Sequence, residues 1–483
     1  MNIKIVGRTI GRVILMEMLF MLPSLIWCLI DQDYDVIGAF GKTFAIMLVT
    51  AGLLLLIGRG ARERFFAQEG FVTVALCWIA ISVMGCLPFY LSGQVPHFID
   101  ALFESISGFT TTGASILPDV EALSRGLLYW RSFTHWLGGM GILVFALAVV
   151  SNKNAGGTLH LMRAESPGPS VGKLTPRLKD TAVILYGIYI AMTVLCLIFL
   201  LLGGMPLFDS LCTAFGTAGT GGFGVKVDSM ASYSPYLQNV CTVFMALFGI
   251  NFSVYYLLLL RRFTDVFHDE ELRWYLLIMA GATGLIAWNI HSITGSLRES
   301  IHHAAFQVSS IMTTTGFSTV DFNIWPTFSK AILLCLMLLG ACAGSTGGGF
   351  KVVRLVLIFK DLGRNIRRTL RPRSVISLRV SGQPISADVM RGVNAFLAAY
   401  MMLIAASVVL VSLEPHSLET TISAVLACFN NIGPGLDVVG PAAHFGMLSD
   451  LSKLVLSADM LLGRLEIFPI LALFSRYSWK RGL

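Results

Sequence analysis

The sequence predicts an all-α polytopic membrane protein with four membrane–pore-loop–membrane repeats around a pseudo-fourfold pore and an extra N-terminal helical hairpin. Three observations lead to this fold class. The 483-residue chain is 55% hydrophobic and only 13% charged, with a mean hydropathy of +0.75. Apolar runs of about 18 residues or more, long enough to cross a bilayer, recur along it. A short threonine–glycine motif appears four times, at intervals of about a hundred residues.

The composition also excludes several classes of protein. Charged residues make up about a quarter of an ordinary soluble domain, so a soluble fold is excluded. The nine cysteines lie scattered in apolar runs without metal-ligand spacing, which indicates small hydrophobic residues rather than a metal site. No nucleophile–base or metal constellation is visible, so we do not expect an enzyme.

The basic residues indicate how the chain is oriented. If the chain has ten spans, most of the 35 Lys and Arg fall at the span ends that face one side of the membrane. Many acidic residues fall at the span ends on the other side. The positive-inside rule then places both termini in the cytoplasm and the threonine–glycine segments toward the outside. The net charge of +7 reflects this asymmetry, and we expect no nucleic-acid partner.

The repeated motif is the feature around which the rest of the chain is arranged. Non-helical backbone at membrane depth must be buried in protein or line a cavity. Glycine reaches positive φ at little cost, so such a run can turn successive carbonyl oxygens to one side. Four runs around an axis would form carbonyl rings able to replace the hydration shell of a cation. The predicted filter residues are Thr110, Thr111, Thr112 and Gly113; Thr220, Gly221 and Gly222; Thr313, Thr314, Thr315 and Gly316; and Asn431, Ile432 and Gly433.

Each repeat is expected to contain a span, a re-entrant pore helix and a return span. The middle segments are too short to cross ~30 Å of hydrocarbon at ~1.5 Å per residue. A pore helix whose C-terminus points at the cavity adds partial negative charge there. The predicted units are a hairpin in 1–68 (spans 10–30 and 36–58); repeat 1 in 69–178 (Gly70–Ser92, Phe98–Phe109, Leu127–Val150); repeat 2 in 179–270 (Asp180–Gly203, Leu207–Thr217, Tyr233–Leu260); repeat 3 in 271–388 (Leu272–Ile293, Arg298–Met312, Phe328–Phe359); and repeat 4 in 389–483 (Val389–Leu413, Ser417–Phe429, Phe445–Phe474).

The return span of the third repeat contains an unusual glycine-rich interruption. Three consecutive glycines each cost a helix about 1 kcal/mol relative to alanine. A non-helical, mobile loop that lines the path beneath the filter explains this composition; close helix packing by small residues is the alternative. The predicted gating loop comprises Gly344, Ser345, Thr346, Gly347, Gly348 and Gly349.

Two charged residues within predicted spans need an explanation. Arg464 is expected near the middle of the last span, where an unpaired charge costs at least about 2.5–3.5 kcal/mol. Glu466 and Asp459 do not have the favoured i±3 or i±4 spacing to it. Arg464 therefore either pairs with a carboxylate on another helix or faces the cavity and repels cations. For Glu17, capping or pairing near the interface is expected.

Nearly the whole chain resembles the Trk/Ktr/HKT family of potassium transporters, and its TrkH branch in particular. The resemblance rests on Gly-Phe-Thr-Thr-Thr-Gly-Ala at 108–114, Gly-Thr-Gly-Gly-Phe at 219–223, Thr-Thr-Thr-Gly-Phe at 313–317 and Asn-Asn-Ile-Gly-Pro-Gly at 430–435. It implies potassium uptake across a bacterial cytoplasmic membrane, a homodimer and a cytoplasmic TrkA-type nucleotide-binding ring. It also implies that the glycine-rich loop is a gate and that Arg464 lies near it. Some relatives with serine at the first filter position pass sodium, so Gly113 favours potassium.

Two other functions remain open at this stage. A cation- or proton-coupled secondary transporter would need midspan carboxylates, and the chain has few, chiefly Glu17, Asp459 and Glu466. A sodium-permeable member of the same family is the other alternative. The basic connector 360–379 is expected to contact the regulatory ring, lipid headgroups or both.

Overall fold

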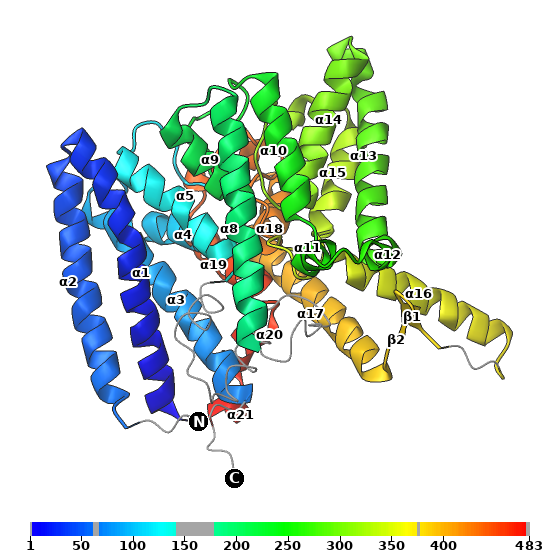
Figure 1. The fold of residues 1–483 in the computed structure, drawn as a ribbon, viewed down its shortest axis with the longest axis horizontal. Coiled ribbons are helices and arrows are strands. Elements are labelled where there is room, and N and C mark those ends of the chain that lie inside the picture. Colours follow the sequence, from blue (N-terminus) through cyan, green and yellow to red (C-terminus); the bar gives the residue numbers. More distant parts are fainter. Residues whose placement is uncertain (1, 61–66, 142–177, 374–376, 480–483) are drawn as a thin grey trace.

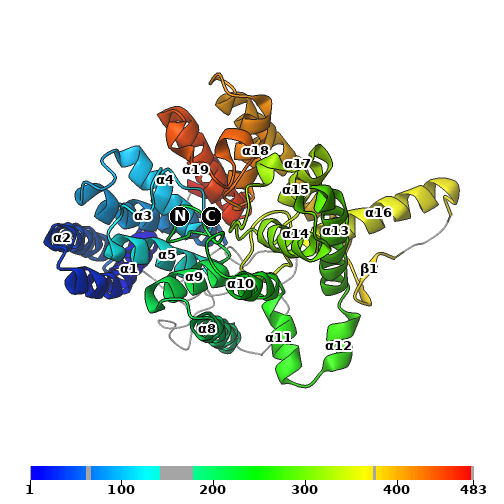
Figure 2. The same cartoon turned by 90° about the horizontal axis from the view of Figure 1, so that it is seen from above.

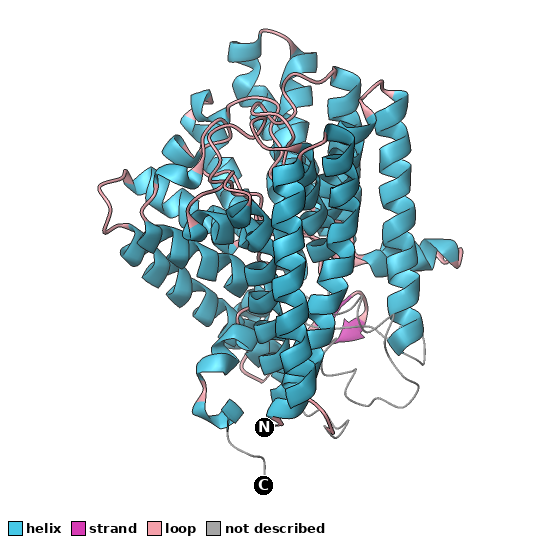
Figure 3. Cartoon of the chain, turned by 90° about the vertical axis from the view of Figure 1, so that its left-hand side faces the viewer, coloured by secondary structure: helices cyan, strands magenta, loops and turns pink. Residues whose placement is uncertain are grey.

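The protein is a bundle of helices in which long and short members alternate. The structure, a computed structural model, describes residues 2–60, 67–141, 178–373 and 377–479. Its only described sheet is one short antiparallel pair, and long helices run side by side through the molecule (Figure 3). The predicted all-α fold class is therefore confirmed.

The N-terminal hairpin stands at one edge of the molecule (Figure 1). It consists of α1 (Ile3–Asp31) and α2 (Tyr34–Ile57). The Asp33 side chain accepts a hydrogen bond from the Val36 N–H and so caps α2. Helix α1 packs on α3 and α5, whereas much of the apolar surface of α2 faces outward, as expected for a helix in contact with lipid.

The remaining chain repeats one order of elements four times: a long helix, a short helix, a turn and a second segment. The long helices are α3 (Ala67–Leu91), α8 (Leu178–Leu202), α13 (Glu270–Thr294) and α17 (Ala387–Val411). The short ones, called pore helices below, are α4 (Phe98–Phe109), α9 (Leu207–Gly219), α14 (Leu297–Met312) and α18 (Leu418–Phe429). The second segments are α5 (Arg125–Gly139); α10 (Pro235–Phe248) with α11 (Phe252–Leu259); α15 (Thr327–Leu338) with α16 (Val352–Leu370); and α19 (Asp450–Arg464) with α20 (Phe468–Phe474).

Short elements complete the chain. They are α12 (Phe263–His268), η1 (Phe322–Ile324), β1 (Arg379–Val380), β2 (Gln383–Pro384), η2 (Asp437–Val439), η3 (Phe445–Met447) and α21 (Arg476–Trp479). In the sheet, Val380 pairs with Gln383. The start of α1, α21, α16 and this sheet lie toward the lower end of the molecule in Figure 1.

The second span of each repeat differs from the continuous helix that its apolar run suggests. Six described helices are long and apolar enough to cross a membrane: α1, α2 and the long helices that open the four repeats. The bent pair α10–α11 would make a seventh. The interruption predicted in the third repeat is observed between α15 and α16, whereas the continuous return spans predicted in the second and fourth repeats are broken. The predicted return span at Leu127–Val150 is described only through residue 141.

In the second repeat, the predicted span Tyr233–Leu260 is broken, with a bend of 90° between α10 and α11. Asn251 starts the second helix because its side chain accepts a hydrogen bond from the Ser253 N–H. A β-carbon at Gly249 would crowd the hydroxyl group of Tyr275 on α13. The carbonyl group freed at Gly249 accepts a hydrogen bond from Cys342, at the start of the glycine-rich interruption.

In the fourth repeat, the predicted span Phe445–Phe474 is also interrupted. Helix α19 ends at Arg464, and Glu466 and Ile467 then adopt φ of 54° and 68°. A β-branched residue rarely occupies positive φ, so the break is held by its surroundings rather than by local preference. Arg464 is consequently the last residue of a helix and not the middle of a continuous span.

The four repeats close into a ring. The second segment of each repeat packs against the pore helix of the next: α5 on α9, α10 on α14, α15 on α18, and α19 on α4. Seen from above, these elements follow one another around a central region (Figure 2). The predicted repeats begin within two residues of α3, α8, α13 and α17 as described, and the division into domains stays a prediction.

Glu17 does not lie at an interface as expected. Its side chain is fully buried in α1, and neither carboxyl oxygen has a hydrogen-bond partner among the described residues. A β-carbon on Gly85 of α3 would be 3.0 Å from its Oε1 atom. Close approach of α3 at this glycine leaves no room for solvent, so capping or pairing at the membrane surface was a wrong prediction.

Candidate functional site: four glycine turns and the loop beneath them

The four predicted motifs share one backbone conformation. The glycines Gly113, Gly222, Gly316 and Gly433 have φ of 79°, 77°, 86° and 99°. The residue two positions earlier is also left-handed in every copy, with φ between 52° and 59° at Thr111, Thr220, Thr314 and Asn431. In the second copy the positive φ falls on Gly222 and not on Gly221. The motif in the fourth copy therefore forms the same turn without the threonines.

The structure brings these four turns together around one axis. A β-carbon at Gly113 would overlap the carbonyl oxygen of Gly221, in the next repeat. The same holds for Gly222 against Thr315 and for Gly316 against Ile432. At Gly433, the β-carbon would be 2.7 Å from the carbonyl oxygen of Thr112, which closes the ring. Each of the four positions thus requires glycine for two reasons: a β-carbon would clash with the carbonyl oxygen of the next repeat, and the backbone has a positive φ.

The pore helices direct their C-termini at these turns. Their C-caps are Thr110, Thr220, Thr313 and Asn430, all within the predicted motifs or next to them. The C-terminal end of a helix carries partial negative charge, so four such ends around one axis favour a cation there. The carbonyl oxygens of the turns add to the same potential.

The threonine side chains stabilise the turns from within. The hydroxyl groups of Thr110 and Thr112 are 2.8 Å apart, and so are those of Thr313 and Thr315. In the fourth copy, Asn431 Nδ2 donates to Thr112 Oγ1 at 3.0 Å and to the Met460 carbonyl oxygen at 2.9 Å. The amide of Asn431 therefore links the fourth turn to the first.

A cavity of about 110 Å³ lies on one side of the four glycines. All four glycines line it, together with residues that directly follow them, such as Ser115, Gly224 and Ser318. Arg131 also reaches its wall. We call this cavity the vestibule.

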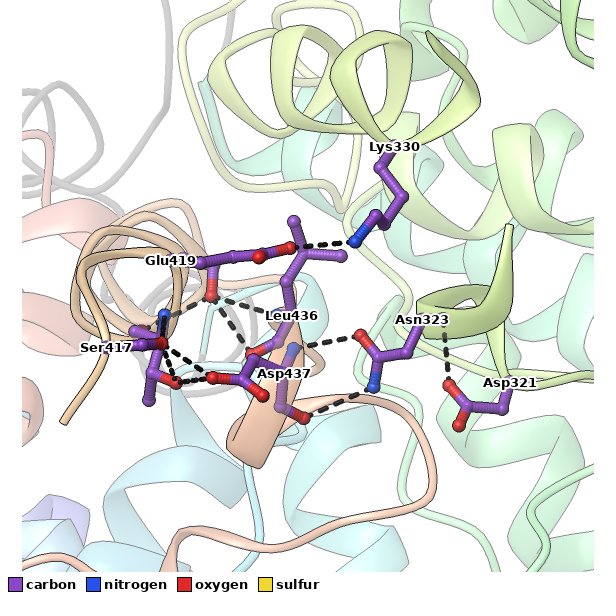
Figure 4. Close-up of polar contacts among 9 residues, drawn as sticks. Asp321, Asn323, Lys330, Ser417, Glu419, Leu436 and Asp437 are labelled. Carbon is purple, nitrogen blue, oxygen red and sulfur yellow. Dashed lines mark hydrogen bonds and ion pairs between the residues drawn. The ribbon is translucent and has the colours of Figure 1, made fainter. Parts of the chain in front are cut away.

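The loops around the vestibule are tied together by polar contacts between the third and fourth repeats (Figure 4). The Asn323 side chain accepts from the Asp437 N–H at 2.9 Å and donates to the Asp437 carbonyl oxygen at 3.2 Å. The hydroxyl groups of Ser417 and Thr420 both donate to the Asp437 carboxylate at 2.6 Å. Asp437 itself has a φ of 58°.

The predicted gating loop lies against the opposite side of the turns. It is non-helical and largely buried, and its two ends meet because the Gly340 N–H donates to the Phe350 carbonyl oxygen at 2.8 Å. The Gly348 N–H donates to Thr314 Oγ1 at 2.7 Å. A β-carbon at Gly347 would be 3.0 Å from the Thr313 carbonyl oxygen. The loop is thus in direct contact with the third turn.

The same loop also contacts the break between α10 and α11 and the start of α13. Phe252 N–H, at the start of α11, donates to the Gly344 carbonyl oxygen at 3.0 Å. Glu271 of α13 accepts from the Ala343 N–H at 2.7 Å and from the Val353 N–H at 3.1 Å. These contacts satisfy backbone groups that a continuous helix would have paired internally.

Arg464 connects the loop to the first turn. Its Nη1 atom donates to Thr111 Oγ1 at 3.1 Å and to the Thr346 carbonyl oxygen at 2.9 Å. Its Nη2 atom donates to the carbonyl oxygens of Gly138 and Gly139, at the end of α5. Glu466 pairs instead with Arg354, at 2.6 Å. The guanidinium group therefore lies beside the loop and beneath the turns.

Several residues of this region were not among the predicted site residues. Lys351 is buried and donates to the carbonyl oxygens of Gly347 and Gly348. His135 is buried with Nδ1 2.8 Å from the Gly108 carbonyl oxygen, and Nε2 accepts from the Phe223 N–H. Glu104 and Arg131 form a buried ion pair at 2.6 Å. The partners of His135 and the two members of the Glu104–Arg131 pair are far apart along the chain, which hides these contacts. Only the presence of charge in apolar segments could have drawn attention to them.

The described residues contain no cluster of His, Cys, Asp or Glu suited to a transition metal. Asp459 is buried and accepts from Ser407 Oγ at 2.7 Å. Among the three carboxylates considered for a secondary transporter, Glu17 and Asp459 are buried in helices and Glu466 is paired.

The fold and the site together define a polytopic membrane protein in which four short helices end at four glycine turns. Residues 37–480 match a family described as TrkH, cation transport protein. The chain belongs to the TrkH family.

Proteins named Trk system potassium uptake protein TrkH, from Halomonas elongata and Salmonella typhimurium, are 36% and 35% identical to it. These matches cover 100% and 99% of this chain, and 100% of each relative. The crystal structure of the potassium transporter TrkH from Vibrio parahaemolyticus superposes with a TM-score of 0.88 at 32% identity. That match covers 99% of this chain and 100% of the other.

Proposed function

We propose that this protein takes up potassium across the bacterial cytoplasmic membrane. The observation that carries the proposal is the closed ring in which each of four glycines faces a carbonyl oxygen of the next repeat. A ring of carbonyl oxygens replaces the hydration shell of a monovalent cation. Relatives that align over the whole chain are named potassium uptake proteins. The potassium ion is the transported species and not a resident cofactor.

The proposed selectivity filter comprises the four threonine–glycine motifs, one from each repeat. Their carbonyl oxygens are the ion ligands, and the glycines allow the backbone to turn them inward. The proposed filter residues are Thr110, Thr111, Thr112, Gly113, Thr220, Gly221, Gly222, Thr313, Thr314, Thr315, Gly316, Asn431, Ile432 and Gly433.

The proposed gate consists of the loop Gly344–Gly349 and Arg464. The loop's hydrogen bond to Thr314 and the guanidinium contact with Thr111 support this assignment, because both lie directly against the turns. A partly buried positive charge at this position repels cations that leave the filter. Opening would require the loop to withdraw and Arg464 to move aside.

The proposed assembly is a homodimer that binds a cytoplasmic TrkA-type nucleotide-binding ring. The names of the relatives place them in the Trk system, which supports a partner subunit. Both termini are proposed to lie in the cytoplasm. In support, the start of α1 and the helix α21 lie at the same end of the molecule in Figure 1. Lipid surrounds the apolar outer faces.

Cation flux into proteoliposomes that contain the purified protein tests the proposal. The wild-type protein should pass potassium in preference to sodium. Gly113→Ser should raise the sodium-to-potassium flux ratio roughly tenfold, equivalent to ~1.4 kcal/mol of lost discrimination. Any side chain at Gly113 would push on the Gly221 carbonyl oxygen and distort the ring.

Gly93→Ser is the matched control. Gly93 also has positive φ, at 74°, but no neighbouring atom lies within 4 Å of a β-carbon there. Its replacement should leave the flux ratio unchanged. A wild-type protein that does not discriminate, or a Gly113→Ser protein with the wild-type ratio, contradicts the filter assignment.

The same vesicles distinguish a proton-coupled transporter, for which the buried carboxylates Glu17 and Asp459 are the candidate groups. Coupled transport would let an imposed pH gradient drive potassium uptake against its own gradient. A filter-limited pathway predicts that the potassium gradient and the voltage alone set the direction of flux.

A further inference from the structure

The buried ion pair between Glu104 and Arg131 lies where two repeats meet beside the vestibule. Glu104 is on the first pore helix, α4, and Arg131 is on α5. Their side chains are 0% and 2% exposed, and Arg131 Nε is 2.6 Å from Glu104 Oε1. Removing two charges from water is costly unless further hydrogen bonds compensate, so the other contacts of this pair reveal its role.

Glu104 holds the chain that leaves the first turn. The Ser115 hydroxyl group donates to Oε1 at 3.0 Å, and the Ile116 N–H donates to Oε2 at 3.0 Å. These residues follow Gly113 by two and three positions. All the contacts of Glu104 are with donors, which matches an ionised carboxylate because that group only accepts.

Arg131 holds the chain that leaves the second turn. Its Nη1 atom donates to the Gly224 carbonyl oxygen at 3.0 Å, two positions after Gly222. The guanidinium carbon lies 3.4 Å from the ring centroid of Phe223, which is a close cation–π contact. The pair therefore links the outgoing segments of repeats 1 and 2 to each other.

The other two repeats hold their outgoing segments with uncharged groups of their own. Ser310 Oγ donates to the Phe317 carbonyl oxygen at 2.5 Å in the third repeat. Ser423 Oγ accepts from the Leu436 N–H at 2.9 Å in the fourth. The position of Glu104, nine residues before the turn glycine, holds Gln307 in the third repeat, whose amide reaches the Val320 carbonyl oxygen at 3.4 Å. Among the described residues, an ion pair that holds the chain leaving two successive turns is thus found at the corner between the first and the second turn.

We propose that Glu104 and Arg131 are positioning residues that set the spacing of the filter between its first and second turns, and through it the preference for potassium over sodium. Neither side chain ligates the ion. Gly113 and the Gly221 carbonyl oxygen face each other at this corner. Releasing either outgoing segment lets this corner contract around a smaller ion. The inference rests on the proposed function as a potassium transporter.

Glu104→Gln and Arg131→Lys test this role in the proteoliposome assay. Glutamine has one acceptor oxygen, so its amide nitrogen must face either Arg131 or Ile116, both donors. Lysine keeps the charge but lacks the planar fork that reaches Glu104 and Gly224 together. Each variant should raise the sodium-to-potassium flux ratio roughly fivefold. For comparison, a tenfold change corresponds to ~1.4 kcal/mol of lost discrimination between the two ions.

Asp100→Asn is the matched control. Asp100 lies on the same pore helix and forms an ion pair with Lys453 of α19 at 2.5 Å, but it has no contact with either outgoing segment. Its replacement should leave the flux ratio unchanged, even if it lowers the melting temperature. A purely structural role of Glu104 would lower the amount of folded protein and leave the ratio alone.

Ser115→Ala keeps the test decisive if the charged pair proves necessary for folding. It removes one hydrogen bond of Glu104 and leaves the ion pair in place, so the protein should fold and still show a raised ratio. A wild-type ratio in every variant that folds overturns the inference while the wild type still prefers potassium. A wild type without preference would instead contradict the proposed function.

Discussion

At the scale of single residues, Arg464 has the contacts of a gate and of a structural brace at once. It donates to the first turn, to the loop and to the end of α5. If its charge blocks the path, Arg464→Ala should fold and raise basal potassium flux roughly tenfold, equivalent to ~1.4 kcal/mol of barrier. Flux into vesicles without any partner protein is the measurement.

Arg354→Ala is the control for this prediction. Arg354 is an equally large cation nearby, but it pairs with Glu466 and lies 3.9 Å from the ring centroid of Phe396. Its loss should change stability without raising flux. Poor folding of Arg464→Ala with no rise in flux would mark Arg464 as a brace only.

A second residue-scale prediction concerns pH and the Asp437 carboxylate. Hydrogen bonds from Ser417 and then Thr420 lower the pKa of Asp437 below its ordinary value. A lowered folded-state pKa stabilises the protein above the unfolded value of about 3.9, and this stability is lost as the pH falls through the folded value. Asp437→Asn should lower the melting temperature in detergent at pH 7, and the gap should shrink below about pH 4.

Asparagine suits this test because it tolerates positive φ, which Asp437 adopts. The substitution therefore removes the charge and leaves the turn. Ser417→Ala should reduce the same pH-dependent gap by removing one of the two donors. If the difference in melting temperature between the wild type and Asp437→Asn does not change as the pH falls below about 4, the charge of Asp437 contributes no stability.

At the scale of elements, the gating loop is a closed insertion whose removal need not move its helices. The Gly340 N–H and the Phe350 carbonyl oxygen already join its ends, between α15 and α16. Replacing residues 342–348 by a short glycine link should raise basal flux roughly tenfold or more, because the obstruction beneath the turns is gone. Proteoliposome flux with and without the partner ring measures this.

The matched control places the same short glycine link at Gly382, between β1 and β2. This position lies away from the four glycine turns of the proposed filter. This insertion should leave flux unchanged. A folded loop-deletion protein with wild-type flux and a wild-type response to its partner would indicate that the loop only packs.

The sequence predicted those elements that carry their own local signal. The pore helix Phe98–Phe109 was predicted with its observed limits, because apolar spacing and the following threonine–glycine motif delimit it. The breaks after Phe248 and Arg464 were not predicted. Asn251 acts as a helix cap only because the gating loop accepts the freed backbone groups, and Ile467 adopts a conformation that its own side chain disfavours. Tertiary contacts decide both, and a single sequence does not reveal them.

The same limit applies to the site. The four glycines were predicted because they repeat, whereas Glu104 and Arg131 were not, because a pair 27 residues apart leaves no pattern. Both residues are buried. Repetition makes backbone features visible in a sequence, and buried pairs become visible only in three dimensions.

At the scale of the whole molecule, the ring of repeats explains why the second segments are broken and the first are not. The long first helices α8, α13 and α17 stand outside and expose apolar side chains, whereas α3 is covered by the N-terminal hairpin. In contact with lipid, every backbone group must be paired within the helix. The second segments pack on the next pore helix, and their breaks receive the loop and Arg464. Non-helical backbone is tolerated there because protein surrounds it.

One basic helix, α16, is exposed outside this ring of repeats. Helix α16 extends away from the body of the molecule in two views at right angles (Figures 1 and 2), and Arg367, Arg368 and Arg373 near its end are exposed. Arg367 and Arg368 lie in its last turn, where they also complement the helix dipole. An acidic protein surface or anionic lipid headgroups would both bind this end.

The last prediction separates these two partners. The double charge reversal Arg367→Glu with Arg368→Glu should weaken binding of the TrkA-type ring roughly tenfold, ~1.4 kcal/mol, in nanodiscs of zwitterionic lipid. The salt dependence of binding should fall with it, because fewer charge pairs remain to be screened. Basal flux without the ring should not change, since Arg367 and Arg368 lie in the last turn of α16, at the end far from the loop that precedes this helix.

Lys4→Glu with Arg59→Glu is the matched control, because both residues are exposed on the N-terminal hairpin and the change in net charge is the same. Equal weakening by both double variants would indicate that the ring responds to total charge and not to α16. Unchanged ring binding by the α16 variant, together with a loss of co-purified anionic lipid, would assign this helix to the membrane surface. Only a selective loss of ring binding supports α16 as the docking element.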